Sequence, residues 1–168
     1  PLCGRNFEYY SEDPLVAGEM AAAMVEGIQS EGVGASLKHF ACNNKETNRK
    51  DCDSRLSERA LREIYLKGFE LCVKKAQPLT VMSSYNLVNG LWASQTDILR
   101  GEWGFKGMVT TDWYTHAPQY TEIAAGNDVK MGCGDPAHVL QMMREGRLKR
   151  EDVVVSVRRL LEMILKLA

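Results

Sequence analysis

Strand-like and helix-like stretches alternate along the chain. Short apolar runs, rich in residues that favour an extended backbone, lie at residues 33–42, 78–86, 106–112 and 127–131. Between and after these runs, apolar residues recur at the three- and four-residue spacing of amphipathic helices. Four strands separated by helices predict a parallel α/β sheet.

The predicted helices carry start and stop signals. In the first helix, Pro14 stands where the first turn tolerates proline, Asp13 precedes it as a cap, and Gly32 follows the end. Further helices are expected over residues 57–76 and 97–103, in a segment that ends at Ala125, and in two closing segments.

Each of the three longest helices has an apolar face. In the first it consists of Val16, Met20, Met24, Val25 and Ile28. In the second it consists of Leu61, Ile64, Tyr65, Phe69, Cys72 and Val73. The last helix is expected to bury a face made of Val154, Val157, Leu160, Leu161, Ile164 and Leu165.

Two parallel architectures compete for this pattern. A doubly wound open sheet would carry a Gly-rich phosphate turn after its first strand, and neither GxGxxG nor the Walker A pattern occurs. A (β/α)8 barrel instead gathers polar and aromatic residues at the carboxyl ends of successive strands. The chain has such residues in the expected places: Lys38 and His39, Tyr85 and Asn86, Asp112 and Trp113, and Lys130. A complete barrel needs eight strands and about 250 residues, so four strands predict a partial (β/α)8 barrel, about half of one.

Composition narrows the classes of function. With 45% hydrophobic and 26% charged residues, the 168-residue chain is typical of a globular domain, and its formal net charge of −1 argues against a nucleic-acid partner. No apolar run is long enough for a membrane span, so no membrane partner is expected, and no signal peptide is visible. The first residue is Pro1 rather than methionine, so an upstream segment is expected.

The cysteines and histidines point to neither a disulfide framework nor a metal site. The five cysteines are scattered and form no CxxC pair, which favours free thiols in a reducing compartment and hence the cytoplasm over secretion. His39, His116 and His138 lack HxxxH or HExxH spacing. We therefore expect no metal and no cofactor.

Four segments in series, "GRNFEYYSEDP", "KHFACNNKETNR", "VMSSYNLVNG" and "GMVTTDW", resemble the N-terminal barrel of glycoside hydrolase family 3, and among its members the β-glucosidases. The resemblance runs through essentially the whole chain. It implies the C-terminal half of that barrel, with the upstream strands absent from this sequence. It also implies a retaining β-glucosidase that acts on terminal β-D-glucosyl residues of a β-glucoside or a short β-linked oligosaccharide.

The resemblance assigns roles to individual residues. Asp112 is implied to be the nucleophile that forms a glycosyl-enzyme intermediate. The implied sugar-binding residues are Arg5, Lys38, His39, Arg49, Met82, Tyr85 and Trp113. The chemistry agrees with these roles, because guanidinium groups donate in a fork and an indole face packs on sugar C–H groups. Considered one by one, the same residues also fit purely structural roles: a helix cap, surface salt bridges, or core packing for Met82 and Tyr85.

Departures from the family pattern also carry information. Members that act on N-acetylglucosamine with a catalytic dyad have "KHFPGHG", whereas this chain has "KHFACNN" and lacks the second histidine, which favours β-glucosides. In the glucosidase branch the acid/base is a glutamate of a following domain, and neither it nor the early-barrel aspartate is in this sequence. "TTDW" replaces the commoner "SDW". No motif supports Glu46, Glu122 or Asp128 as a local acid.

Two alternative interpretations remain. The chain is either part of an active glycosidase or a truncated, non-catalytic half-barrel with at most residual sugar binding. A third interpretation, an unrelated barrel enzyme such as an aldolase, is supported in the sequence only by Lys38 beside His39. A half-barrel by itself exposes strand edges and helix faces, so it is expected to be marginally stable, to aggregate or to form a homo-oligomer with a second copy.

Overall fold

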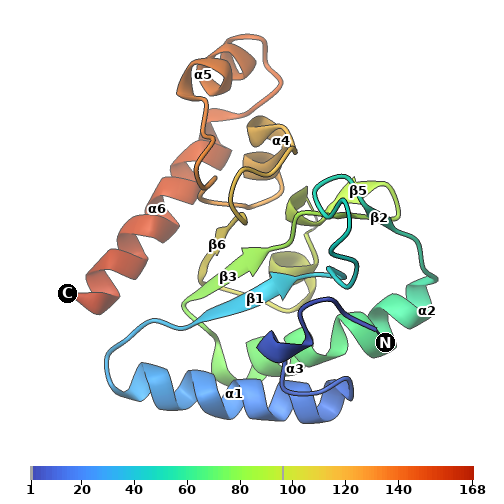
Figure 1. Cartoon of the computed structure of the whole chain (residues 1–168). Helices are drawn as coiled ribbons and strands as arrows, with labels where there is room; N and C mark the ends of the chain where they lie inside the picture. The colour runs from blue at the N-terminus through green and yellow to red at the C-terminus, as the bar shows by residue number, and fades with distance from the viewer. Residues whose placement is uncertain (1, 96) are drawn as a thin grey trace.

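The computed structural model describes residues 2–95 and 97–168. Its centre is a parallel sheet in the order β1 (Ser36–Phe40), β3 (Thr80–Ser83), β6 (Met108–Thr110) (Figure 1). The fourth predicted strand forms only one parallel bridge, from Thr110 to Val129. The predicted strand order along the chain is therefore also the order across the sheet, as in successive βα units.

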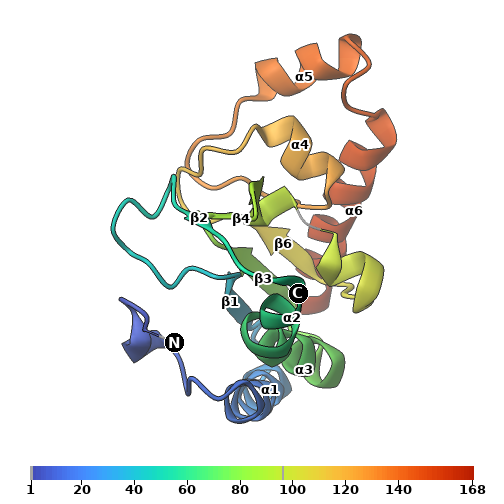
Figure 2. The same ribbon diagram turned by 90° about the vertical axis from the view of Figure 1, so that its right-hand side faces the viewer.

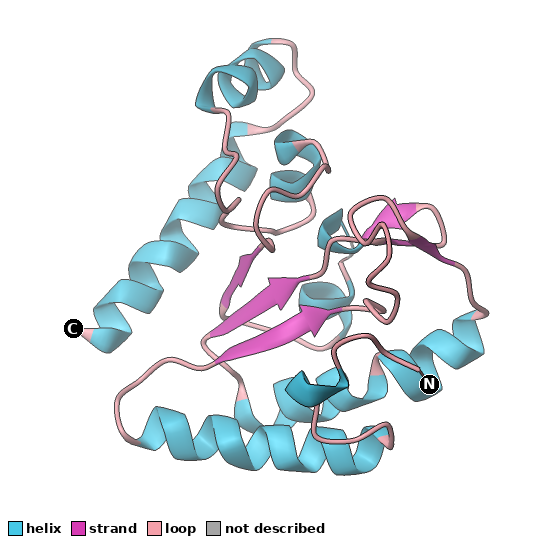
Figure 3. Ribbon diagram, viewed as in Figure 1, coloured by secondary structure: helices cyan, strands magenta, loops and turns pink. Residues whose placement is uncertain are grey.

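A second, smaller sheet was not predicted. It joins β2 (Asp53–Ser54), β4 (Leu87–Val88) and β5 (Leu91–Trp92), with β4 and β5 antiparallel around the Asn89-Gly90 turn. β2 lies between the predicted strand at residues 33–42 and the predicted helix at residues 57–76, where the sequence analysis expects no strand. The small sheet stands beyond the carboxyl ends of the central strands and so covers part of that edge (Figure 3).

The predicted helices are present, although the segments predicted at residues 57–76 and 97–103 contain π-helical turns. The chain begins with a 3₁₀ turn, η1 (Asn6–Glu8), followed by α1 (Pro14–Ser30), which is capped by the Asp13 carboxylate as predicted. The predicted helix over residues 57–76 divides into α2 (Glu58–Ala60), the π-helical turn η2 (Leu61–Tyr65) and α3 (Lys67–Ala76). The remaining elements are η3 (Ala93–Gln95), η4 (Ile98–Glu102), α4 (Gln119–Ala124), α5 (Pro136–Arg144) and α6 (Arg150–Leu167).

Helices cover the sheet from its outer side. α1 and α3 lie side by side against the β1–β3 part, whereas α4, α5 and α6 gather beside β6 (Figure 2). α1 approaches α3 closely at Gly18, where an added Cβ would lie 2.8 Å from the Leu71 side chain. The contact face of α1 is therefore Gly18, Ala22 and Val25, rather than the Met20 and Met24 of the sequence pattern, which remain half exposed.

The main core lies between the sheet and these helices. Val81 and Val109 point from the strands toward Phe40, Val73 and Trp103, and the Phe40 ring meets Trp103 edge-on with centroids 5.9 Å apart. The residues between the inward-facing strand positions, such as Met82, point to the opposite, more open face. In a (β/α)8 barrel the helices cover the outer face of the sheet, and side chains from the other strands pack on the inner face.

The expectation for the last helix is wrong. Val157, Leu161, Ile164 and Leu165 are 50% or more exposed, and the only fully buried residue of α6 is Ser156. The rotation of the helix is set by polar contacts instead: the Ser156 hydroxyl donates to the Asp128 carbonyl, and Arg159 pairs with the Asp128 carboxylate at 3.0 Å. Leu160 of the same face is only half buried.

Candidate active site

The carboxyl ends of the central strands bring together most of the residues singled out by the sequence. Asp112 follows β6 by two residues, and its backbone N–H donates to the Ser83 carbonyl at the end of β3. Tyr85 follows β3, and His39 lies near the end of β1. Because all three strands are parallel, their ends meet at one edge.

β1 is irregular at this edge. Its pairing with β3 shifts register between Leu37 and Phe40, and the Lys38–His39 and Phe40–Ala41 peptide bonds are cis. The register shift breaks the usual alternation of sides, so His39 and Phe40 are both buried. Phe40 enters the core, and His39 faces Asp112.

Asp112 is the centre of the cluster. Its Oδ2 lies 3.6 Å from His39 Nε2, its Oδ1 accepts the backbone N–H of Trp113 at 2.7 Å, and its side chain is only 9% exposed. Burial, followed by the neighbouring Asp112 carboxylate, raises the pKa of Tyr85, so this phenol stays protonated with the carboxylate beside it. Among residues 2–95 and 97–168, the ion-pair partner of the Asp112 carboxylate is His39, and no lysine or arginine lies within ion-pair distance of it.

A carboxylate that the sequence analysis did not assign organises the cationic residues. Glu8 Oε1 accepts from Arg5 Nε at 2.9 Å, and Glu8 Oε2 lies 3.3 Å from Lys38 Nζ and 3.9 Å from His39 Nδ1. Burial works against the charged form of Glu8, but the hydrogen bonds from Arg5 and Lys38 outweigh it and lower its pKa. Glu8 therefore fixes Arg5 and Lys38 next to His39.

His39 is held as a neutral imidazole. Burial, and next the charge of Lys38, lower its pKa below the usual 6.5, although Asp112 opposes the shift. The Tyr9 hydroxyl lies 3.2 Å from His39 Nδ1. A tautomer that accepts the Tyr9 proton at Nδ1 leaves the Nε2–H directed at the Asp112 side. His39 can therefore donate to an oxygen placed between it and Asp112.

Arg49 joins the cluster through an aromatic ring. Its guanidinium carbon lies 4.5 Å from the centroid of the Tyr85 ring, and its Nη1 pairs with Glu46 Oε2 at 3.1 Å. Such a cation–π contact fixes the plane of the ring as well as the cation. Arg49 and Tyr85 are accordingly a single unit beside Asp112.

Trp113 and Met82 are placed differently from the rest. The Trp113 ring is 53% exposed, so it is not part of this chain's core, and it lies beside the equally exposed Tyr114 ring with centroids 6.0 Å apart. Gly132, at φ +78°, passes so close behind both rings that a Cβ there would clash with them. Met82 lies half buried on β3, in register with Thr110, and among the described contacts none ties its side chain to Asp112.

Three polar residues near the strand ends have structural roles. Lys130 Nζ is buried and donates to Glu122 Oε2 at 2.9 Å, to Thr115 Oγ1 at 3.0 Å and to the Ala117 carbonyl at 2.7 Å. Asp128 is enclosed by Arg100, Arg159 and the Val109 N–H. Glu122 and Asp128 are therefore closed off, in line with the lack of motif support for either as an acid.

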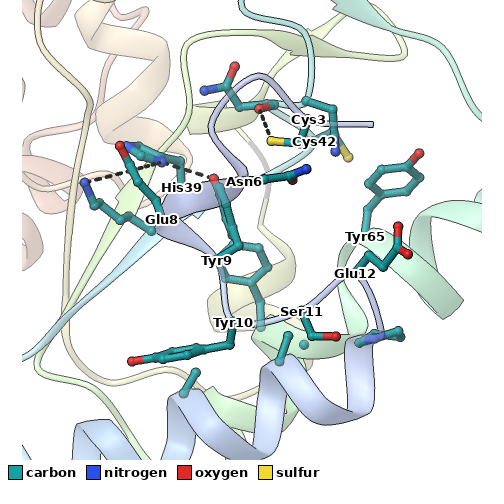
Figure 4. A pocket seen from close by; sticks show the side chains of 18 of the residues that line it. Cys3, Asn6, Glu8, Tyr9, Tyr10, Ser11, Glu12, His39, Cys42 and Tyr65 are labelled. Atoms are coloured by element: carbon teal, nitrogen blue, oxygen red, sulfur yellow. Dashed lines mark hydrogen bonds and ion pairs between the residues drawn. The ribbon is translucent and has the colours of Figure 1, made fainter. Parts of the chain in front are cut away.

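A cavity of about 180 Å³ lies beside the cluster, and Asp112 is not among its lining residues (Figure 4). It is enclosed by η1 and the residues after it, by α1, by η2 and by β1. Glu8, Tyr9 and His39 form its boundary with the cluster, while apolar residues such as Tyr65 and Phe69 line its other side.

Three further features of the described residues concern metal sites, membrane spans and disulfides. Among residues 2–95 and 97–168, no group of three or more His, Cys, Asp or Glu side chains is arranged to hold a metal ion. None of the helices in that part of the chain combines the length and hydrophobicity needed to cross a bilayer. All five cysteines are free thiols.

Sequence reasoning missed Glu8 and Tyr9 as members of the cluster. Both lie within "GRNFEYYSEDP", but nothing in the local pattern shows which side chain turns toward a strand some 30 residues away. The available signal was the position of a carboxylate three residues after Arg5, in a segment too short to form a stable helix.

Comparison with known proteins gives one consistent family. The model of the glycosyl hydrolase family 3 N terminal domain matches residues 1–163. Beta-glucosidase A of Butyrivibrio fibrisolvens is 56% identical over an alignment of 158 positions that covers 91% of this chain and 19% of that protein. An exo-alpha-(1->6)-L-arabinopyranosidase of Bifidobacterium breve is 49% identical over an alignment of 157 positions that covers 88% of this chain and 20% of that protein. The chain thus spans about a fifth of the length of these curated relatives.

Solved structures agree with the sequence comparison. Beta-glucosidase 3B from Thermotoga neapolitana in complex with glucose matches 99% of this chain with a TM-score of 0.93 and 48% identity, and the match covers 25% of that protein. A beta-glucosidase from Kluyveromyces marxianus in complex with glucose matches 99% with a TM-score of 0.92 and 40% identity. The prediction of an α/β chain forming part of a (β/α)8 barrel is confirmed.

Proposed function

The chain belongs to glycosyl hydrolase family 3, and on that premise we propose that the protein containing it is a retaining β-glucosidase. It removes terminal non-reducing β-D-glucosyl residues from β-glucosides and short β-linked oligosaccharides. The chain is the C-terminal half of the barrel, and the upstream strands and an acid/base domain lie outside it. The observation that carries the proposal is the buried Asp112 carboxylate, 3.6 Å from His39 at the strand ends.

The chemistry follows from a carboxylate at that place. Asp112 Oδ attacks C1 of the sugar, and the bond from C1 to the leaving-group oxygen breaks through an oxocarbenium-like transition state. The leaving oxygen takes a proton from an acid supplied from outside these residues. Water then attacks C1, gives its proton to the same group and releases Asp112. The neutral Tyr85 phenol stays beside the carboxylate and orients it for attack.

The surrounding residues bind the sugar hydroxyls. Arg5 and Lys38, fixed by Glu8, offer N–H donors on one side of Asp112, and Arg49 offers them from the Tyr85 side. The His39 imidazole, near the end of β1, donates a further hydrogen bond to a sugar hydroxyl. The exposed Trp113 ring packs on the C–H face of a sugar, and Met82 forms part of the pocket wall.

A fluoro-sugar trap tests the assignment in the complete protein. A 2-deoxy-2-fluoro-β-glucosyl fluoride is expected to inactivate the enzyme and to leave its label on the peptide that contains Asp112. Asp112→Asn should abolish both turnover and labelling. Asp51→Asn, which changes an exposed carboxylate paired with His116, serves as the matched control. Label on any residue other than Asp112 would contradict the assignment.

A second specificity is favoured by one comparison. Because a relative 49% identical to the chain is an α-L-arabinopyranosidase, turnover of 4-nitrophenyl α-L-arabinopyranoside should be measured beside the β-D-glucopyranoside. We expect the glucoside to have the higher kcat/KM. The reverse order would make α-L-arabinopyranosides, rather than β-D-glucosides, the preferred substrates.

The isolated 168 residues are proposed to be inactive. Proton donation to the leaving group contributes about 10²–10⁴-fold, and the group that supplies it is implied to lie outside the chain. Aryl β-glucoside turnover by the isolated chain and by the complete protein compares the two directly. Sedimentation of the isolated chain tests the expected pairing with a second copy through its exposed apolar helix faces. A stable monomer would argue against that pairing.

A further inference from the structure

Lys50 lies between two aromatic rings at the rim of the candidate site. Its Nζ is 5.6 Å from the centroid of the Tyr85 ring and 5.7 Å from that of the Tyr114 ring. The side chain is half buried on the loop that follows β1. Two cation–π contacts hold the ammonium group in place, although no motif in the sequence points to this residue.

The charge balance of the site sets Lys50 apart. Arg5 and Lys38 both pair with Glu8, and Arg49 pairs with Glu46. Within residues 2–95 and 97–168, no carboxylate lies within ion-pair distance of Lys50, whose recorded contacts are the two ring faces. An aromatic face offers no lone pair along an N–H direction, so the three ammonium donors remain available to water or to a ligand.

The position of Lys50 decides which part of a substrate it meets. His39 and Asp112 are buried, and Tyr85 is buried with them, whereas Trp113 and Tyr114 are each 53% exposed. Lys50 stands at the boundary, with Tyr85 on the buried side and Tyr114 on the exposed side. A sugar whose C1 reaches Asp112 fills the buried part, so its leaving group extends along the exposed rings.

We propose that Lys50 is a specificity-determining residue that binds an acidic group, such as a carboxylate, on the leaving group. This inference rests on the proposed function, because it needs a glycoside in the site. The Trp113 and Tyr114 rings offer apolar surface to the body of the leaving group, while the unpaired ammonium selects its charge. A carboxylate-bearing aromatic aglycone fits both features.

Two substrates of the complete protein isolate this effect. 4-Carboxyphenyl and 4-carbamoylphenyl β-D-glucoside have nearly the same shape and differ in charge at the end remote from C1. For the wild type, the ratio of kcat/KM for the acid to that for the amide is the readout. In Lys50→Met the ratio is expected to fall by about 5- to 10-fold, the effect of one partly exposed charge-assisted hydrogen bond. Lys50→Arg, which keeps the charge, should retain most of the ratio.

Lys45→Met is the matched control, since Lys45 is an exposed lysine of the same loop, and it should leave the ratio unchanged. Lys50→Gln is a second neutral variant and should behave as Lys50→Met does. An unchanged ratio in both neutral variants overturns the proposal. An equal loss for both substrates also overturns it, because Lys50 would then only position the two rings. If the wild type turns over neither substrate, the proposed function itself fails, and this inference fails with it.

Discussion

Removal of the Lys130 ammonium should expose how strongly the loop after Asp112 depends on a buried charge pair. Lys130 Nζ makes three hydrogen bonds, to Glu122, Thr115 and the Ala117 carbonyl, and the Glu122 side chain is 0% exposed. In Lys130→Met the carboxylate keeps only neutral hydroxyl partners, the nearer being Ser94 at 2.8 Å. Breaking a buried pair on one side costs about 3–5 kcal/mol, which lowers the folding equilibrium constant by roughly two to four orders of magnitude.

The pH dependence of this loss has a definite sign. Burial raises the pKa of Glu122 above its usual 4.5, and Lys130 opposes the rise. Without Lys130 the folded-state pKa is higher still, so stability is present below 4.5 and is lost as pH rises through the folded pKa. The destabilisation of Lys130→Met should therefore be smaller near pH 5 than near pH 8.

Urea unfolding followed by tryptophan fluorescence measures the effect. Lys106→Met, which alters an exposed lysine just before β6, is the control and should change the free energy of unfolding little. Lys130→Met/Glu122→Gln should recover part of the loss, because a neutral amide needs no counter-charge and still accepts from Ser94. A loss below about 1 kcal/mol in Lys130→Met, or no recovery in the double variant, would refute the reasoning.

Three further predictions concern the site. Tyr85→Phe in the complete protein should lower kcat/KM by about 10- to 100-fold, the value of one hydrogen bond to a charged group, and steady-state kinetics checks this. The folded pKa of His39 lies below the unfolded value of 6.5, so its contribution to stability is present above pH 6.5 and is lost as pH falls from there through the folded pKa. Urea unfolding at pH 5 and 8 should therefore show less pH dependence in His39→Gln. Gly132→Ala should lower the free energy of unfolding by about 1–2 kcal/mol, because residue 132 has φ +78°, and urea unfolding measures this loss. The new methyl group should also displace Trp113 and so raise KM, which steady-state kinetics measures.

Much of the site was visible in the sequence because its residues follow strands. Parallel strands bring their carboxyl ends to one edge whatever lies between them, so Asp112, Tyr85 and His39 were expected to meet, and they do. The resemblance to family 3 rested on the same strand ends and on the segment around Arg5. A linear pattern suffices where each residue's position depends on its own strand.

The local sequence pattern gave a wrong prediction where long-range contacts decide the orientation of a helix. The apolar face of α6 was expected to be buried, but Asp128, 31 positions before Arg159, fixes the rotation of the helix through charge and leaves Leu161 and Ile164 exposed. Hydrophobic periodicity shows that a helix has an apolar side and cannot show which part of the protein covers it.

The sequence by itself determined the alternation of strands and helices, the order of the strands in the sheet and the residue types at their ends. Only the tertiary structure decided that Glu8 gathers Arg5 and Lys38 beside His39, that Lys130 closes on Glu122 instead of facing a ligand, and that Lys50 lies between two rings. The physical reason is that backbone preference and periodicity act over a few residues, whereas charge pairing and burial depend on groups that meet only after the chain has folded.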